Sequence, residues 1–257
     1  MPVLTHAIGA AVRGFAVLIL CVALTACVSA EKRARLADIH TKLGAGYLQR
    51  GQLQIAQDEL KQALAADPDH VEANNVMALL QAQLQDYDAA ESYFRAALDT
   101  APDNAEVHNN YGAFLCERGR YDAADEHFRK ALADRLYRTP DLANLNAGLC
   151  ALKKPAPDKA RDYFRTALAI NSRLTPALFQ LAQLSYDAGQ NLSARGYMQR
   201  YFALAHDSPQ ALWLAIQIER ALGNRDLQAA YAMRLKAKFG DSPEAQALRT
   251  PIRPPRR

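Results

Sequence analysis

The chain has 257 residues with a formal net charge of +4, a length that allows one large domain or two small ones. Alanine supplies 50 residues and aromatic side chains only 8%, a balance that favours helix packed closely on helix and excludes a strand-rich barrel or sandwich. The positive charge is diffuse and not interleaved with aromatic residues, so no nucleic-acid partner is expected.

Residues 1–26 are predicted to be a signal peptide. Arg13 precedes a short, unbroken apolar run over residues 15–24. A signal-peptide core has about 7–15 apolar residues, whereas a membrane-spanning helix needs about 20. The segment is therefore expected to direct export rather than to span a membrane.

The signal peptide ends in a sequence that resembles the lipobox of bacterial lipoproteins. Residues 24–27 read Leu-Thr-Ala-Cys, and the resemblance implies that Cys27 is lipidated and begins the mature chain. Several acyl chains hold a protein stably on a bilayer. Neither Val28 nor Ser29 is the aspartate associated with inner-membrane retention, so the expected location is the periplasmic face of the outer membrane. The alternative is an ordinary cleaved signal peptide with a chance cysteine.

A repeat of 34 residues organises the rest of the chain after a short linker over residues 27–36. One alanine recurs at spacings of 34, 34, 36 and 34 residues, with a large apolar residue four positions later and a small residue twelve positions earlier. Internal periods of this length are typical of solenoids. The alanines are Ala56, Ala90, Ala124, Ala160 and Ala194, the large residues are Leu60, Phe94, Phe128, Phe164 and Met198, and the small ones are Gly44, Ala78, Gly112, Gly148 and Ala182.

This pattern resembles the tetratricopeptide repeat, which implies an all-α superhelix of about six helix–turn–helix units. Small residues let two antiparallel helices approach closely, and the large side chain fills the groove beside them. A recurring glycine, as at Gly51 and Gly119, supplies the turn between the helices. The expected units are 37–70, 71–104, 105–138, 141–174, 175–208 and a degraded sixth, 209–242. Residues 243–257 are expected to form a disordered basic tail.

Two cysteines remain in the repeats, at nearly equivalent positions in the first helices of the third and fourth units. Because first helices of adjacent units pack side by side, Cys116 and Cys150 could form a disulfide in an oxidising periplasm. The alternative is a pair of buried, reduced cysteines. The sequence leaves both possibilities open.

No catalytic or cofactor-binding motif is visible. The sequence has no phosphate-binding Gly-Lys-Ser/Thr loop, no His-Glu-x-x-His and no Gly-x-Ser-x-Gly elbow. Its histidines lack metal-ligand spacing. We therefore expect neither an enzyme, nor a metal or cofactor site, nor a small-molecule substrate, and we expect function to lie in a surface that binds protein.

The first helices of stacked repeats line a groove, the usual place for a partner peptide or helix. Groove-facing positions are rich in asparagine in the second and third units and in leucine in the fourth. Asparagine can bond an extended backbone through both donor and acceptor, and leucine can bury apolar anchors.

The anchor and the repeats together resemble the type IV pilus biogenesis lipoproteins of the PilF/PilW family. The closest stretches are residues 107–116, 145–150 and 163–168, read as VHNNYGAFLC, LNAGLC and YFRTAL. The resemblance implies a pilotin, a lipoprotein that binds subunits of the secretin PilQ, carries them to the outer membrane and promotes their multimerisation. The family's groove lies chiefly in the first units, which by position selects Asn75, Leu79, Asn109 and Asn110 as the partner-binding residues.

Two alternatives remain. One is a lipid-anchored scaffold for another envelope machine, such as outer-membrane protein insertion or peptidoglycan synthesis. The other is a peptidoglycan-associated enzyme that docks through the repeats, but no segment outside the repeats is long enough to hold a catalytic domain.

Overall fold

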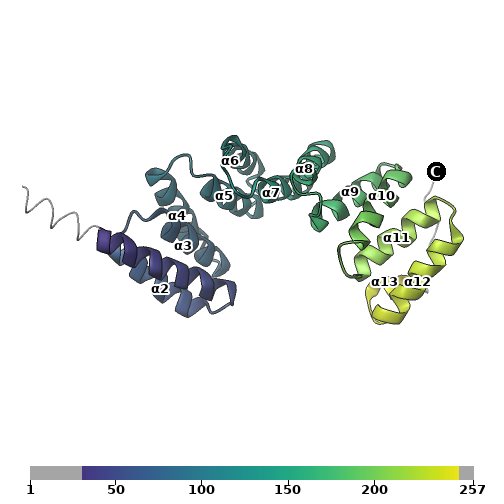
Figure 1. The fold of residues 1–257 in the computed structure, drawn as a ribbon, viewed down its shortest axis with the longest axis horizontal. Helices are drawn as coiled ribbons and strands as arrows, with labels where there is room; N and C mark the ends of the chain where they lie inside the picture. The colour runs from purple at the N-terminus through teal and green to yellow at the C-terminus, as the bar shows by residue number, and fades with distance from the viewer. Residues whose placement is uncertain (1–30, 249–257) are drawn as a thin grey trace, which may run out of the picture. The chain divides into compact units, whose positions relative to one another are not determined.

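The computed structural model describes residues 31–248, which are helical and contain no strands (Figure 1). A first helix covers residues 31–49. Twelve further helices follow: α2 Leu53–Ala66, α3 Val71–Gln83, α4 Tyr87–Thr100, α5 Ala105–Glu117, α6 Tyr121–Ala133, α7 Pro140–Lys153, α8 Pro157–Ile170, α9 Thr175–Asp187, α10 Asn191–Phe202, α11 Pro209–Ala221, α12 Arg225–Phe239 and α13 Pro243–Ala247.

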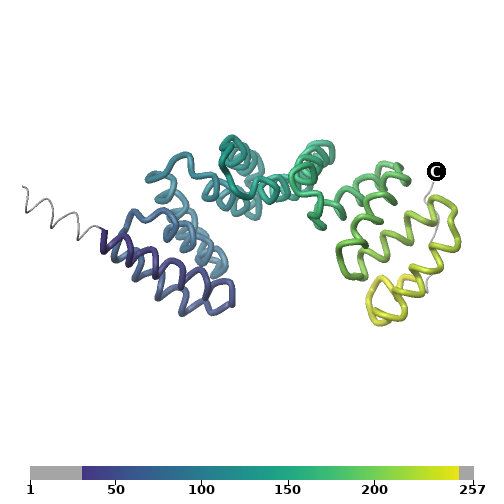
Figure 2. Tube along the Cα trace, viewed as in Figure 1, coloured from purple at the N-terminus to yellow at the C-terminus, as the bar shows by residue number. Residues whose placement is uncertain are grey.

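Consecutive helices pair as antiparallel hairpins, which confirms the all-α tetratricopeptide-repeat fold. The pairs α3–α4, α7–α8, α9–α10 and α11–α12 share the most extensive packing, and the tube in Figure 2 traces the same hairpins. The second helix of a hairpin also packs on the next hairpin, as α8 does on α9. The chain divides into two compact units between Tyr111 and Gly112.

Local sequence fixes where the helices begin and turn. The side chains of Asp86, Ser208 and Asn224 accept hydrogen bonds from the backbone N–H three residues later, which satisfies a free donor at each helix start. Proline occupies the first turn of α7, α8, α9, α11 and α13, where its fixed φ suits the helix and its missing N–H costs nothing.

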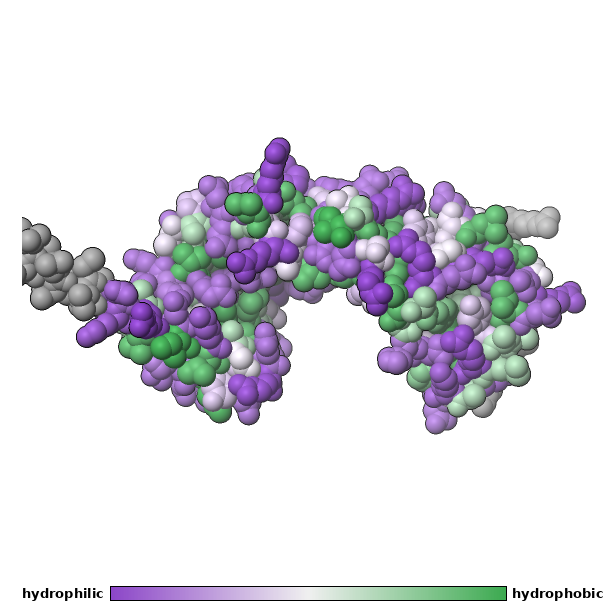
Figure 3. Space-filling model, viewed as in Figure 1, coloured by the Kyte–Doolittle hydropathy of each residue, from purple (hydrophilic) through white to green (hydrophobic). Residues whose placement is uncertain are grey.

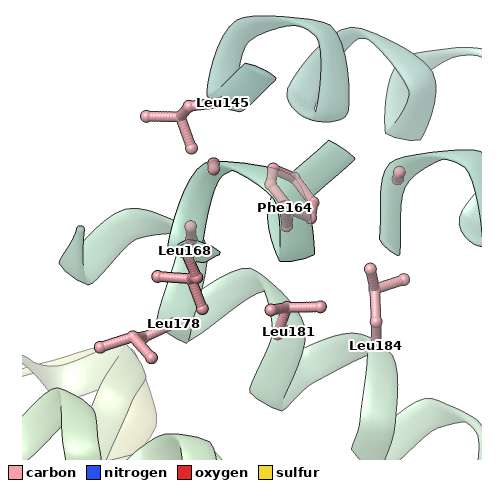
Figure 4. Packing of buried hydrophobic residues seen from close by; sticks show 9 residues of the cluster. Leu145, Phe164, Leu168, Leu178, Leu181 and Leu184 are labelled. Carbon is pink, nitrogen blue, oxygen red and sulfur yellow. The ribbon is translucent and has the colours of Figure 1, made fainter. Parts of the chain in front are cut away.

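The recurring alanines and large apolar residues form the cores of the hairpins. Phe164 is completely buried with Ala160 and Ala167, and it packs with Leu178 and Leu181 of α9. Figure 4 shows Phe164, Leu178 and Leu181 among the labelled side chains of this cluster. Full burial of a phenylalanine contributes about 2–3 kcal/mol, so the residue four positions after the alanine is a main source of stability in each repeat.

A buried ion pair joins the last two hairpins. Arg195 of α10 donates two hydrogen bonds to Glu219 of α11, one of them from Nε to Oε1 at 2.9 Å. The carboxylate is almost fully buried. The two hydrogen bonds from the guanidinium offset the cost of burying this carboxylate.

The described helices extend beyond the predicted repeats at both ends. The linker expected through residue 36 is helical from residue 31, because Glu, Lys, Arg, Ala and Leu in this stretch are strong helix formers even without an apolar period. The tail expected to be disordered from residue 243 begins instead with α13. Ser242 caps this helix, and Ala245 is buried against Leu212 and Leu235. The rest of the tail from residue 249, the signal peptide and Cys27 lie outside the described residues.

Candidate functional site

The predicted partner-binding residues lie on the first helices of the second and third repeats, within the first compact unit. Asn75 and Leu79 are on α3, and Asn109 and Asn110 are on α5. Their exposure differs. Asn75 is only 1% exposed and Asn109 only 7%, whereas Leu79 and Asn110 are half-buried.

The asparagines bond to one another, and one of the bonds joins α5 to α3. Asn110 Nδ2 donates to Asn75 Oδ1 at 3.2 Å, and Asn109 Nδ2 donates to Asn110 Oδ1 at 3.4 Å. Because a buried amide costs free energy unless it is paired, these bonds explain how Asn75 is tolerated inside. The amides hold neighbouring repeats in register.

Partner binding by these four residues stays a prediction, but Asn75 and Asn109 are buried in this arrangement. Side chains this buried cannot offer their amides directly to a partner in this conformation. Their position in the repeat predicts that they face the groove, but the structure buries both side chains. Leu79 and Asn110 are the two predicted residues that remain accessible.

A second set of polar side chains fixes the starts of the first helices, and the sequence reading did not single it out. Asn74 Nδ2 donates to the Pro68 carbonyl at 2.9 Å, and Asn144 Nδ2 donates to the Pro140 carbonyl at 2.7 Å. His108 Nε2 lies 2.8 Å from the Pro102 carbonyl. All three occupy the fourth position of their repeat, so alignment of the repeats at that column is the signal that reveals them.

Histidines also tie the first repeat together. His40 Nδ1 lies 2.7 Å from Glu59 Oε2 of α2. His70 Nδ1 accepts from the backbone N–H of Ala73 at the start of α3, while its Nε2 lies 3.0 Å from Asp38 Oδ1. Nδ1 of His70 is therefore unprotonated, and Nε2 donates. These histidines connect the helices of the first repeat.

Cys116 and Cys150 are joined by a disulfide. The two Cα atoms lie 5.8 Å apart, a separation within the range that disulfides require. The bond links the end of α5 to α7 within the second compact unit. The structure thus resolves the two possibilities that the sequence left open in favour of the bonded pair.

A pocket of about 160 Å³ lies beside this disulfide, between α6 and the α7–α8 hairpin. Its apolar wall includes Phe128 and Ala147, and its rim carries two ion pairs. Lys154 Nζ lies 2.5 Å from Asp122 Oδ1, and Lys159 Nζ lies 2.7 Å from Asp125 Oδ1. The cations and carboxylates of the rim are therefore already paired with each other.

Asp125 is the most heavily bonded carboxylate at this rim. Burial acts to raise the pKa of Asp125, but hydrogen bonds from Lys159 and Tyr163 outweigh it, so the pKa is lowered. The Tyr163 hydroxyl donates to Asp125 Oδ1 at 2.8 Å, and burial together with this bond raises the pKa of Tyr163. The network ties α6 to α8.

Residues 31–248 hold no cluster of three or more metal-ligating side chains. Over the same residues, every helix is too short or too polar to cross a bilayer. The arrangement that the structure offers for function is a set of helix faces suited to binding.

Comparison with known proteins identifies the repeats. Two tetratricopeptide-repeat family models match residues 41–112 and 81–147. These residues include the first helices that carry Leu79 and Asn110.

The similarity to two pilus proteins covers nearly the whole chain. The type IV pilus assembly protein PilF of Pseudomonas aeruginosa is 31% identical over 244 residues, which are 91% of this chain and 97% of PilF. The solved PilF structure superposes with a TM-score of 0.78, covering 85% of this chain and 98% of that one. PilW, described as a widely conserved type IV pilus biogenesis factor, is 35% identical with a TM-score of 0.76, covering 84% and 99%.

Proposed function

Because the chain belongs to the tetratricopeptide-repeat family of type IV pilus assembly proteins that includes PilF and PilW, we propose that it is a pilotin for the pilus secretin. It is a repeat protein of type IV pilus biogenesis. The finer proposal is that it binds PilQ subunits, brings them to the outer membrane and promotes their assembly into the multimeric pore. The observation that carries this proposal is that the match to PilF spans 97% of that protein.

We assign PilQ binding to the accessible side chains of α3 and α5, the first helices of the second and third repeats. Leu79 offers a half-buried apolar contact, and Asn110 offers an amide that Asn75 and Asn109 orient. A preoriented amide beside an apolar side chain suits an extended or helical segment of a partner. A protein that gathers subunits in this way needs exposed contacts and a location, and no chemical step.

We attribute attachment of the protein to the membrane to lipidation of Cys27. An acylated cysteine four residues before the first described helix would hold the repeats at the membrane surface. Secretin subunits bound to the repeats would then be delivered to the bilayer in which the pore assembles. The outer membrane, at its periplasmic face, remains the proposed destination.

Secretin assembly in cells lacking this chain tests the proposal. Heat-sensitive, detergent-resistant PilQ multimers should be lost from unboiled gels or be retained in the inner-membrane fraction. Normal multimers in the outer membrane would contradict the pilotin role and leave a lipid-anchored scaffold for another machine. Cys27→Ser should displace the protein and the multimers from the outer membrane while preserving PilQ binding.

A pair of substitutions tests the binding surface. Leu79→Asp places a charge at the proposed contact on α3, whereas Leu192→Asp alters the most exposed apolar side chain of α10. Both variants should retain wild-type helicity and protein level. Loss of PilQ co-purification with Leu79→Asp alone supports the surface, and equal binding by the two variants would remove it.

A further inference from the structure

The first helix, residues 31–49, carries an exposed apolar stripe. Leu36, Ile39 and Leu43 are three and four residues apart, a spacing that places them on one side of a helix. Ile39 is 50% exposed and Leu43 is 41% exposed. In Figure 3, apolar side chains gather among polar ones over the N-terminal helices on the face in view.

The positions of Ile39 and Leu43 are buried in every later repeat. Their counterparts at the same place in the repeat are Ala73 and Met77, Val107 and Tyr111, Ala143 and Ala147, Ala177 and Leu181, and Ala211 and Ala215. None of these ten is more than 5% exposed. Met77 illustrates the cause, because it packs against Ala56 and Leu60 of the preceding α2.

Ile39 and Leu43 therefore belong to the surface that each repeat presents to the repeat before it. Within residues 31–248 no repeat precedes the first one. We call Leu36, Ile39 and Leu43 the open stacking face. Solenoid proteins need capping elements with a polar outer face at their ends, and this end presents apolar side chains instead.

The other end of the repeats is covered. Helix α13 packs on α11 and α12, and Ala245 is buried with Leu212, Ile216 and Leu235. The sequence thus supplies a short capping helix after the last hairpin. Because the other end is capped, we expect the exposed apolar side chains of the open stacking face to be covered by something other than a repeat.

The charges around the open stacking face are basic. Lys32 and Arg35 lie four residues before Leu36 and Ile39, so each shares the side of the helix that carries the stripe. Arg33 is also exposed. Asp38 is held by His70, and Glu31 pairs with Arg35 at 3.6 Å with both side chains largely exposed, an arrangement that contributes little and exchanges readily.

We propose that the open stacking face lies against an anionic lipid surface, with Leu36, Ile39 and Leu43 in the interface and Lys32 and Arg35 on lipid phosphates. A helix with an apolar stripe beside basic residues is suited to lie in a membrane interface. The inference rests on the proposed lipidation of Cys27. Four residues span at most about 14 Å, so the helix would begin close to the acylated residue.

This contact would orient the protein as well as hold it. A lipid anchor alone does not fix the orientation of the folded repeats. Seating the first helix on the bilayer would fix which faces of the first repeats point toward the periplasm. The partner-binding residues on α3 and α5 would then be presented in one orientation.

Depth-sensitive fluorescence on the full, membrane-extracted chain tests the proposal. An environment-sensitive label is attached at Ile39→Cys or, as the matched control, at Ile170→Cys on α8, which is also 50% exposed. Each protein is reconstituted into vesicles of phosphatidylethanolamine and the anionic lipid phosphatidylglycerol. The label at position 39 should emit at shorter wavelength and be quenched several-fold more by brominated acyl chains than the label at position 170.

The outcomes separate this proposal from the one on which it rests. A chain that floats with the vesicles but reports water at position 39 overturns the membrane contact and leaves the anchor intact. A blue shift without quenching by brominated lipid means that a protein, either a second copy or a partner, covers the face, and it also overturns the contact. A wild-type chain that fails to float contradicts the anchor and the contact together. Lys32→Glu with Arg35→Glu should return the label at position 39 toward water while flotation persists.

Discussion

The ring of Phe164 closes over the backbone of Gly148 so tightly that a Cβ built on Gly148 would lie 2.5 Å from Cε1 of the ring. Contacts below 3.0 Å force a shift, and Phe164 is completely buried among its neighbours. Gly148→Ala should therefore lower the free energy of unfolding by about 1–3 kcal/mol, the usual cost of overpacking a core. Urea unfolding followed by circular dichroism measures the change.

Gly196→Ala is the matched control. Gly196 lies inside α10, and no atom lies within 4 Å of the Cβ that would be added. Alanine is the better helix former by about 0.5–1 kcal/mol, so this variant should be more stable than the wild type. Equal effects at the two sites would mean that helix propensity, rather than the contact with Phe164, decides which residues fit.

The contact between Gly148 and Phe164 could be predicted from the sequence because it depends only on the repeat. The same 16-residue spacing joins Gly112 to Phe128 and Gly44 to Leu60, where an added Cβ would lie 2.9 Å and 2.7 Å from the large side chain. Packing inside a hairpin is local, so the pattern of small and large residues is enough to specify it. The fold class followed from this pattern.

The accessibility of the candidate site could not be predicted in the same way. Periodicity places Asn75 on the groove side of α3, but its burial depends on the side chains of α5, which lie a repeat away along the chain. The helix from residue 31 and the α13 cap were missed because neither continues the repeat. Their helices follow from propensity and from the Ser242 cap, signals that the 34-residue period does not contain.

The disulfide between Cys116 and Cys150 should be a major source of stability in the second compact unit. It closes a loop of 34 residues, and restricting the unfolded chain in this way is worth about 4 kcal/mol in the chain-entropy model. Cys116→Ala with Cys150→Ala should lower the thermal midpoint substantially. Scanning calorimetry with and without reductant measures the loss.

Reductant should lower the midpoint of the wild type toward that of the double variant and leave the double variant unchanged. Both cysteines are buried, so alanine at the two positions also removes the packing of the two sulfur atoms, a loss that reduction of the wild type does not cause. A wild type that is insensitive to complete reduction would contradict a stabilising role for the bond.

Asp125 should make the protein sensitive to acid. Its hydrogen bonds to Lys159 and Tyr163 lower the pKa of the folded carboxyl below its ordinary value of 3.8, so the unfolded state binds the proton first. The stabilisation is fully present above about pH 5, roughly one unit over the ordinary pKa. It is lost as the pH falls through the lowered pKa of the folded carboxyl. Unfolding free energies measured from pH 6 to pH 3 should decline less steeply in Asp125→Asn.

Asp162→Asn serves as the control for this pH dependence, because Asp162 is exposed on α8. At neutral pH, Asp125→Asn should cost no more than about 1 kcal/mol, since the lost ion pair with Lys159 is partly solvated. Parallel pH profiles for Asp125→Asn and the wild type would show that the carboxylate is not the acid-sensitive group.

Gln85 should be a site at which a single substitution stabilises the protein. It has φ of 65° at the turn between α3 and α4, where the corresponding turns use Gly51, Gly119, Gly189 and Gly223 with φ from 72° to 74°. A non-glycine residue in this left-handed region strains the folded state by about 1–2 kcal/mol. Glycine removes this strain, but its greater backbone freedom stabilises the unfolded state and offsets part of the gain. Gln85→Gly is therefore expected to raise the free energy of unfolding by up to about 1 kcal/mol, and Gly119→Ala to lower it by a similar amount. Opposite signs in parallel urea titrations would support the conformational argument, whereas a destabilised Gln85→Gly would show that the glutamine side chain stabilises this turn by contacts that outweigh its backbone strain.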